Sequence, residues 1–385
     1  MRNSVLAAKF SLFLCVVFLC CGKINKDKDM SEDIKKYHWV PVVSAPVKYP
    51  VEVFDMDFIL EKVPEGDLNT EEFSFFGNPT IHQGMAVGSC GISYDENNKT
   101  VLPHCVDALW LSYLDRKVYS LYADLPYEQI EYLFSKGYDY YDEKDSLIKK
   151  SFESLDLCFL PDGKAVLYMK GNTRTILLDW IAQGKETEEF NDAICEKERT
   201  KSIKEFIDWT LDHNSDMVVD KDLPIAFLIN KYFERFLYKI NVDFENENSS
   251  VVWAREDYTN SELLIARNRS RVESIKMPSR IKTYEMTWNC NEYKYHAYFY
   301  FNEEEMLRLF DEAYGENHSQ EGVLNISVCK YNNLFEISLN VGERKFIFQK
   351  TEIRVFKAPK SDEKGNWELV YKNYEKNHQN NFRVK

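Results

Sequence analysis

The stretch VLPHCVDALWLSYLDRKVYSLYADLPYEQIEYLF at residues 101–134 decides the fold of this chain. Apolar and polar residues alternate on both sides of a turn at residues 115–116, a pattern typical of a β-hairpin. The residues after Pro126 predict an amphipathic helix with Ile130, Leu133 and Phe134 on its apolar face. The stretch therefore predicts the order strand, strand, helix.

A second stretch, MPSRIKTYEMTWNCNEYKYHAYFYFNEEEMLRLF at residues 277–310, follows the same plan 176 residues later. Met306, Leu309 and Phe310 stand where the first stretch has its three apolar helix residues. Each predicted helix is followed by a polar loop and by alternating strands, up to residues 178 and 348. We expect an α+β fold of two related halves, each a largely antiparallel sheet with a helix on one face. The alternative is that alternation recurs by chance among β-rich segments.

The segment between the two stretches is charged and predicts helices. Ile203, Phe206 and Ile207 recur at helical spacing, and Pro224 precedes a further helical pattern. We assign residues 38–190 to a first α+β repeat, residues 191–235 to a helical connection and residues 236–385 to a second repeat. Because the connection is amphipathic and not rich in Gly and Ser, we expect it to pack against both repeats.

The first 21 residues have the pattern of a bacterial export signal. Arg2 and Lys9 supply a positive start, and residues 10–19 form an apolar core shorter than the roughly 20 residues of a membrane-spanning helix. Cys21 ends this signal and precedes a polar tether at residues 22–37, as in lipoproteins whose acylated cysteine is the first mature residue. Cys20 and Cys15 fit this pattern less well, and an ordinary cleaved signal is the alternative. We expect a lipid on Cys21 to anchor the chain in the outer membrane, facing the periplasm.

Acidic residues outnumber basic ones in the mature chain. Removal of residues 1–21 leaves 47 basic against 63 acidic residues, a net charge near −16. This charge excludes a general nucleic-acid binder, which needs a basic surface to neutralise phosphates. It favours a basic protein partner instead.

Six cysteines follow Cys21 in the sequence. Cys90 and Cys105 flank a turn-rich stretch and form the candidate disulfide, while the alternative is that the cysteines are small buried side chains. These two cysteines, His82 and His104 are zinc-ligand types, but their spacing matches no tight ligand pair.

Catalytic motifs are absent from the sequence as well. Asp55 and Asp57 lie on one face of a predicted strand, where a solvated surface is the alternative to paired catalytic carboxylates. The sequence contains no Gly-x-Ser-x-Gly nucleophile elbow and no glycine-rich phosphate loop. We therefore expect a protein that is not an enzyme and has no metal or cofactor.

An acidic, tyrosine-rich stretch at residues 138–145 is the candidate surface for a protein partner. Its candidate contacts are Tyr138, Asp139, Tyr140, Tyr141, Asp142 and Glu143. Tyrosine supplies contact area at a low cost in conformational entropy. A solvated polar loop is the alternative.

Several short motifs resemble a family of Gram-negative lipoproteins known as a domain of unknown function. They are the run from Trp39 to Pro46, Tyr49-Pro50-Val51, the pattern of residues 102–134, Leu223-Pro224 and Tyr232-Phe233-Glu234-Arg235-Phe236. The resemblance covers roughly residues 37–357 and transfers no active site. The genes of some members lie beside genes for secreted lipase effectors, which implies an immunity role for those members.

Two functional hypotheses follow from these observations. The first is a non-catalytic, lipid-anchored envelope protein that binds a partner protein, with immunity to a secreted effector as one form of this role. The second is a periplasmic lipoprotein that binds a small ligand or a glycan. A deep apolar cleft with converging polar groups would favour the second hypothesis, or an envelope enzyme of unrecognised type.

Overall fold

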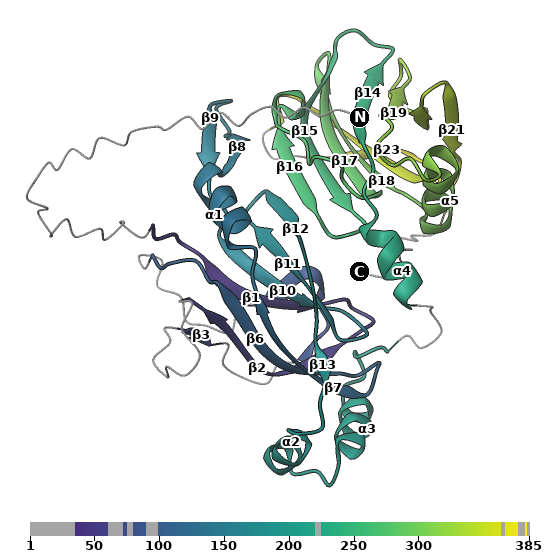
Figure 1. The fold of residues 1–385 in the computed structure, drawn as a ribbon. Helices are drawn as coiled ribbons and strands as arrows, with labels where there is room; N and C mark the ends of the chain where they lie inside the picture. Colours follow the sequence, from purple (N-terminus) through teal and green to yellow (C-terminus); the bar gives the residue numbers. More distant parts are fainter. Residues whose placement is uncertain are drawn as a thin grey trace, which may run out of the picture. The chain divides into compact units, whose positions relative to one another are not determined.

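The computed structural model describes residues 35–60, 72–74, 80–89, 99–219, 225–362, 366–375 and 382. Residues 36–385 form one compact unit. Strands make up most of the regular structure, with α-helices between and beside the sheets (Figure 1). The α+β class expected from the sequence is therefore present, with strands dominating.

The first half of the unit contains two sheets. One sheet has β1 (Val40–Ala45), β5 (Gly84–Ser89), β10 (Ser154–Phe159), β11 (Lys164–Lys170) and β12 (Arg174–Gln183). The other has β2 (Val51–Ile59), β3 (Glu72–Ser74), β4 (Thr80–Ile81), β6 (Cys105–Ser112), β7 (Lys117–Asp124) and β13 (Lys185–Glu186). Strand β1 pairs in parallel with β10, and the other pairs in both sheets are antiparallel.

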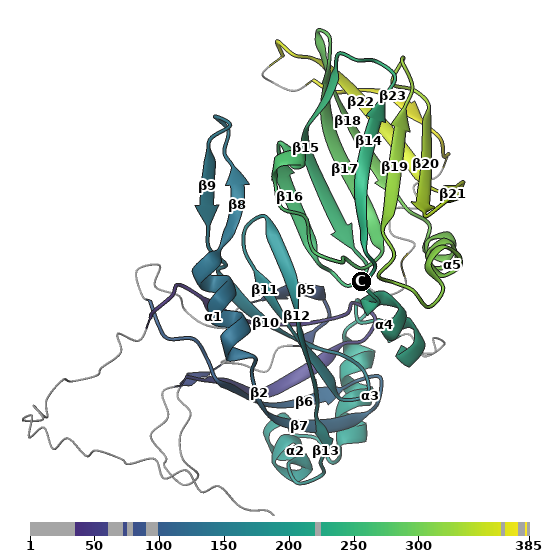
Figure 2. The ribbon, with the colours of Figure 1, turned by 45° about the horizontal axis from the view of Figure 1, so that its top comes forward.

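The first half also contains a helix and a hairpin. Helix α1 (Tyr127–Lys136) follows β7, and Gly137 ends it with a φ of 59°. The strands β8 (Tyr138–Tyr141) and β9 (Leu147–Lys150) pair with each other in a separate two-stranded sheet. The helix therefore leads directly into a hairpin that extends from the body of the half (Figure 2).

The second half also contains two sheets. One has β14 (Tyr238–Phe244), β19 (Gly322–Val328), β20 (Phe335–Val341) and β21 (Arg344–Phe348), with β14 parallel to β19. The other has β15 (Ser249–Tyr258), β16 (Leu263–Arg267), β17 (Ile281–Cys290), β18 (Tyr293–Tyr300), β22 (Glu352–Pro359) and β23 (Glu368–Lys372). A 3-10 turn, η1 (Arg269–Arg271), follows β16. Helix α5 (Glu303–Tyr314) packs on β20 and β21, and its cap residue Asn302 accepts a hydrogen bond from the Glu305 amide.

A short strand pairing and three helices connect the halves. Strands β12 and β16 pair through Arg174 with Leu264 and Thr175 with Leu263, which joins strands of both halves in one eleven-stranded sheet. The connection contains α2 (Asn191–Glu198), α3 (Ile203–His213) and α4 (Ile225–Phe233). Phe206 and Ile207 of α3 are buried, so its apolar stripe packs against the first half as its spacing predicts.

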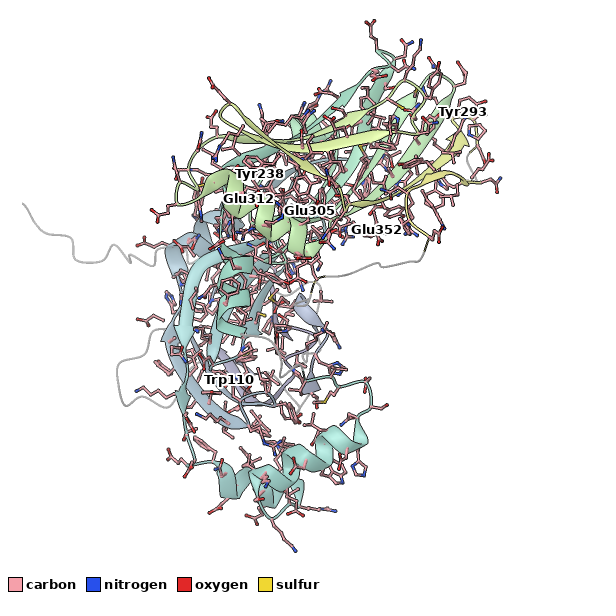
Figure 3. The ribbon with its side chains drawn as sticks, turned by 90° about the vertical axis from the view of Figure 1, so that its right-hand side faces the viewer. Trp110, Tyr238, Tyr293, Glu305, Glu312 and Glu352 are labelled. Carbon is pink, nitrogen blue, oxygen red and sulfur yellow. The ribbon has the colours of Figure 1, made fainter. Side chains whose placement is uncertain are left out.

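Each half has its own hydrophobic core between its two sheets. Trp110 lies in the first core and Tyr238 in the second (Figure 3). Ile130 and Phe134 of α1 are buried and Leu133 is partly buried, while Met306, Leu309 and Phe310 of α5 are all buried. The expectation of one sheet under one helix was incomplete, because the core of each half is enclosed by a second sheet as well as by the helix.

Candidate ligand-binding cavity

A cavity of about 610 Å³ lies where the two halves meet. The first half contributes the end of α1, the base of the β8–β9 hairpin and the start of β12. The second half contributes residues 273–277, which run from η1 toward β17. The apolar part of the lining consists of Leu133, Phe152, Ile176, Leu177, Ile275 and Met277. Its volume lies within the range of about 300–1,000 Å³ that is usual for small-molecule sites.

Arg174 is the polar residue that distinguishes this cavity. It begins β12 after a tight turn, in which the Gly171 amide donates to the Arg174 carbonyl at 2.8 Å. The residue is only 6% exposed, and burial lowers the pKa of its guanidinium. Arginine nevertheless stays protonated in proteins, so a buried positive charge lies beside the apolar residues of the lining.

Most hydrogen-bond donors of Arg174 have no acceptor in the part of the chain that the structure describes. Its Nη2 donates to the Ser274 carbonyl oxygen at 3.3 Å, while the buried Nε has no partner. Among the described residues, no carboxylate forms an ion pair with this guanidinium. A buried charge without a counter-ion is costly, so the site is suited to receive an anion.

The tight turn before Arg174 also fixes Tyr138 at the cavity. A Cβ atom on Gly171 would lie 2.5 Å from the Tyr138 hydroxyl oxygen, so the close approach of the tyrosine requires glycine. The Tyr138 ring packs on Phe152 with the ring centroids 5.2 Å apart. Both aromatic residues line the cavity, and their packing holds its apolar wall in place.

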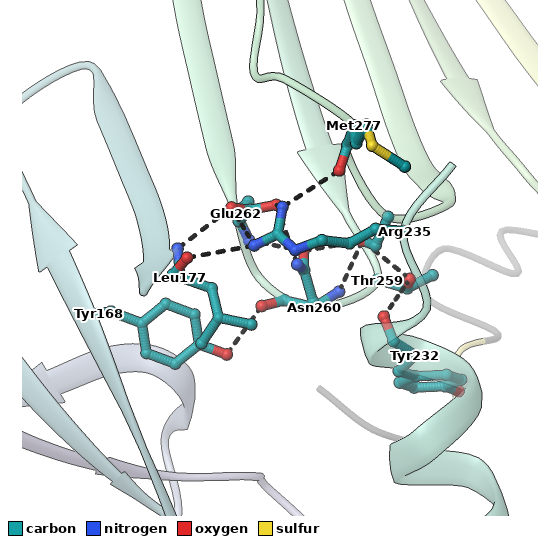
Figure 4. A network of polar contacts seen from close by, with 9 residues as sticks. Tyr168, Leu177, Tyr232, Arg235, Thr259, Asn260, Glu262 and Met277 are labelled. Carbon is teal, nitrogen blue, oxygen red and sulfur yellow. Dashed lines mark hydrogen bonds and ion pairs between the residues drawn. The ribbon is translucent and has the colours of Figure 1, made fainter. Parts of the chain in front are cut away.

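The rear wall is a network of polar contacts around Glu262 (Figure 4). The Glu262 carboxylate is fully buried and accepts from Arg235 Nη2 at 2.9 Å and from Arg235 Nη1 at 3.1 Å. It also accepts from the Leu177 amide at 3.2 Å and from Asn260 Nδ2 at 2.9 Å. Arg235 donates further to the carbonyl oxygens of Leu177 and Met277. The charge of Arg235 is therefore already neutralised.

Charged residues of both signs surround the cavity mouth. Lys136 pairs with Glu273 at 3.4 Å, and both side chains are largely exposed. Lys276 and Asp179 are exposed as well. Because exposed pairs are weak and screened by salt, Arg174 is the strongest electrostatic feature for a ligand inside the cavity.

The acidic, tyrosine-rich stretch is a β-hairpin and not the polar loop expected from the sequence. Strand β8 pairs with β9 from Tyr138 with Lys150 to Tyr141 with Leu147. The Asp142 carboxylate accepts from the amides of Lys144 at 2.8 Å and Ser146 at 2.9 Å, which stabilises the turn.

The candidate contacts in this hairpin have different environments. Tyr138 is buried in the first core, which corrects its expected role as a surface anchor, and Tyr141 packs against the second core. Tyr140 and Asp139 are half-buried, and Asp139 lies 2.6 Å from Lys149. The Glu143 side chain is 89% exposed. The hairpin therefore contacts the cores of both halves, and its turn is accessible to solvent.

The cysteine predictions lie partly outside the described residues. Cys21 and Cys90 both fall there, so the lipid on Cys21 and the Cys90–Cys105 disulfide stay predictions. Cys105 is buried at the start of β6, with its thiol 3.2 Å from the Asp124 carboxylate.

The described part of the chain also bears on the candidate metal ligands and on the candidate pair of catalytic carboxylates. There, no group of three or more His, Cys, Asp and Glu residues is arranged to hold a metal ion. Asp55 is exposed on β2 and Asp57 is half-buried on the same strand. No described helix is long and apolar enough to cross a membrane.

A second hollow lies on the outer face of the eleven-stranded sheet. It has a volume of about 450 Å³ and is lined by Glu285, His296, Tyr298, Phe356 and Trp367. His296 Nε2 lies 2.9 Å from a Glu285 carboxylate oxygen, and the Trp367 ring lies 5.7 Å from the imidazole.

The comparisons place the chain in a family. A family model described as a protein of unknown function, DUF2931, matches residues 23–256, more than half of the chain. The chain belongs to this family. No curated protein and no solved structure shows significant similarity to it. The match includes Arg174 and Arg235 and ends before Glu262, so the second-half wall of the cavity lies outside the matched region.

Sequence reasoning did not identify Arg174. In the sequence it is one more basic residue after an Asn-Thr turn, and arginines are usually exposed. Its burial depends on residues 273–277, which lie about a hundred positions away. No local signal in the sequence indicates that contact.

Proposed function

We propose that this chain is a lipid-anchored, non-catalytic binding protein of the bacterial envelope, and that the Arg174 cavity is a small-ligand site. The observation that carries the proposal is the buried guanidinium of Arg174, which has no carboxylate partner among the described residues and lines a cavity of ligand size with an apolar part and a polar part. The anchor is the lipid expected on Cys21, which would place the cavity in the periplasm at the outer membrane. The structure thus favours the second hypothesis from the sequence.

The absence of catalytic motifs in the sequence supports a binding role. The described cavity lining contains no histidine and no cysteine, the side chains most often used as bases and nucleophiles near neutral pH. Of its three carboxylates, Glu262 is occupied by Arg235, Asn260 and the Leu177 amide, Glu273 is paired with Lys136, and Asp179 is exposed. The lining is better suited to hold a molecule than to transform it.

Filling the cavity tests this proposal. Ile176→Trp adds a large side chain to the lining, and Ile181→Trp is the matched control because Ile181 lies on the same strand and is 68% exposed. We expect native mass spectrometry of protein purified from envelopes to show a small molecule on the wild type and on Ile181→Trp but not on Ile176→Trp. The same spectrum for both variants would contradict the proposal.

A protein partner is a second proposed function, and the turn of the β8–β9 hairpin favours it. Leu147 and Ile148, at the start of β9 after the turn, are 55% and 38% exposed, and Glu143 in the turn is exposed too. Exposed aliphatic side chains next to an acid suit a partner with a basic rim around an apolar contact. Occlusion of a secreted effector is the form of this role that the family resemblance implies.

Charge reversal at the hairpin tests the partner proposal. Glu143→Lys removes an acid whose carboxylate lies 4.0 Å from Arg267, whereas Asp142 holds the turn and is left unchanged. For a partner recovered from envelope extracts, we expect Glu143→Lys to slow association and Glu343→Lys, at another exposed site, to leave the rate unchanged. Equal association rates for both variants would remove the hairpin from the binding surface.

We also infer that the two halves are copies of one unit. Support comes from their strand pairing: β1 is parallel to β10 and followed by β11 and β12, as β14 is parallel to β19 and followed by β20 and β21. The second sheet of each half also has the same neighbour order, which is β2-β6-β7-β13 in the first half and β15-β17-β18-β22 in the second. Helix α1 follows β7 as α5 follows β18. If the two halves superpose only with their strands and helices in a different chain order, this inference is contradicted.

A further inference from the structure

We infer that the Arg174 cavity selects an amphiphilic monocarboxylate, a molecule with one carboxylate and an apolar body. This inference rests on the proposed small-ligand function and specifies the ligand's chemistry. It follows from the charge that the cavity leaves without a partner, the number of such charges, and the apolar character of the wall next to it.

A comparison with Arg280 shows that Arg174 lacks the usual partners of a buried arginine. Arg280 is fully buried, and its Nη2 contacts the carboxylates of Glu234 at 2.6 Å and Asp311 at 2.5 Å. Its guanidinium also lies over the Phe236 ring, 4.5 Å from the centroid. Arg280 leaves its Nε without an acceptor, but two carboxylates meet its charge. Arg174 has one carbonyl oxygen instead.

The donors of Arg174 match a carboxylate. Only Nη2 has a hydrogen bond among the described residues, so Nη1 and Nε have no acceptor there. A guanidinium presents its N–H groups in a planar fork that suits the two oxygens of a carboxylate. Such a charge-assisted contact is stronger at a buried guanidinium than at one in solution.

The balance of charge favours a monoanion over a phosphate dianion. Arg235 is neutralised by Glu262, Lys136 is paired with Glu273, and the exposed Lys276 and Asp179 carry opposite charges, so the lining has one net positive charge. A dianion would leave a second negative charge uncompensated near the carboxylates of Glu262 and Glu273. A monocarboxylate matches the remaining charge one to one.

The rest of the lining favours an apolar body on the ligand. Ile176 and Leu177 continue along β12 from Arg174, and Leu133, Phe152 and Ile275 complete the apolar wall. Burying the methylene groups of a ligand there removes apolar surface from water and so favours binding. A short acid such as acetate would use the guanidinium and leave this wall in contact with water.

Calorimetric titration of the full-length Cys21→Ser chain with octanoate, octanamide, octyl phosphate and acetate tests the inference. We expect octanoate to bind at least tenfold more tightly than each of the other three probes. Arg174→Gln should weaken octanoate binding at least tenfold and leave octanamide binding unchanged. Arg308→Gln is the matched control, because Arg308 is an exposed arginine on α5, and it should bind octanoate as the wild type does.

The outcomes separate this inference from the proposed function. Equal affinity of the wild type for octanoate and octanamide would overturn the carboxylate inference. Equal affinity of the wild type and Arg174→Gln for octanoate would overturn it as well. Neither result would decide whether the cavity binds a ligand, which the mass spectrometry of Ile176→Trp and Ile181→Trp tests separately. Tighter binding of octyl phosphate or acetate than of octanoate would overturn it too. The acid-to-amide comparison uses the unaltered cavity, so it decides the question even if Arg174→Gln does not fold.

Discussion

Arg235 and Glu262 form a bidentate ion pair that connects the two halves behind the Arg174 cavity, with nitrogen–oxygen distances of 2.9 and 3.1 Å. Arg235 follows α4, Glu262 lies in the turn between β15 and β16, and both contact the backbone of Leu177 in β12. The pair therefore links the helical connection and the β15–β16 turn of the second half to strand β12 of the first half. It also fixes the wall against which a ligand would bind.

Removing Arg235 should strongly destabilise the protein. Arg235→Ala leaves the fully buried Glu262 carboxylate without its cation, which costs about 3–5 kcal/mol in comparable buried pairs. Urea unfolding monitored by circular dichroism measures this cost. Arg308→Ala breaks an exposed pair with Glu312 and should cost below about 1 kcal/mol. Equal costs for the two variants would show that the Arg235 pair does not hold the halves together.

The helix of each half should contribute similarly to stability. Phe134 of α1 and Phe310 of α5 are 4% and 0% exposed, so Phe134→Ala and Phe310→Ala should each cost about 3–5 kcal/mol in the free energy of unfolding. Tyr132→Ala is the control on α1, since Tyr132 is 60% exposed, and it should change stability by about 0.5 kcal/mol or less. A loss from Phe134→Ala no larger than the control would contradict the placement of α1 over the core.

Local patterns in the sequence predicted the local structure. The alternation around residues 115–116 predicts the β6–β7 hairpin, and the spacing of Met306, Leu309 and Phe310 predicts α5. These elements depend on neighbours a few residues apart, which a single sequence displays.

Pairings between distant segments could not be predicted in this way. The parallel pair β1–β10 joins strands more than a hundred residues apart, and the second sheet over each core follows from such pairs. The β8–β9 hairpin was missed because its turn is made by an Asp142 side chain and a positive φ at Asp145 in a stretch rich in polar residues. Arg174 was missed for the same physical reason as β1–β10, since its surroundings come from the other half.

Lipid attachment at Cys21 can be measured directly. Metabolic labelling with an alkyne fatty acid should mark the wild type, while Cys21→Ser should lose the label and leave the membrane fraction. Cys20→Ser is the matched control and should be labelled as the wild type is. Label retained by Cys21→Ser and lost by Cys20→Ser would move the site to Cys20. A single acyl chain anchors only marginally, so stable attachment depends on multiple chains at Cys21, and Cys21→Ser should remove all of them.

Two buried carboxyl groups should make stability depend on pH. Glu52 is 6% exposed and accepts hydrogen bonds from Thr80 at 2.6 Å and Tyr113 at 3.1 Å. Asp156 is fully buried, 2.7 Å from the Ser44 hydroxyl and 3.2 Å from Lys170. Burial raises the pKa of each group above its ordinary value, against the opposing effect of these partners.

The direction of the pH dependence follows from the raised pKa values. The folded state binds the proton more tightly than the unfolded chain does, so the contribution of each group to stability is complete below the ordinary carboxyl pKa of about 4. It is lost as the pH rises through the raised pKa of the folded state. Glu52→Gln keeps an acceptor for Thr80 and Tyr113 and has no charge to desolvate.

The wild type should therefore gain stability relative to Glu52→Gln when the pH falls from 7 toward 4, as measured by urea unfolding at each pH. A difference that is constant, or that favours the wild type as the pH rises, would mean that Glu52 is ionised in the fold without cost, because Thr80 and Tyr113 compensate its burial.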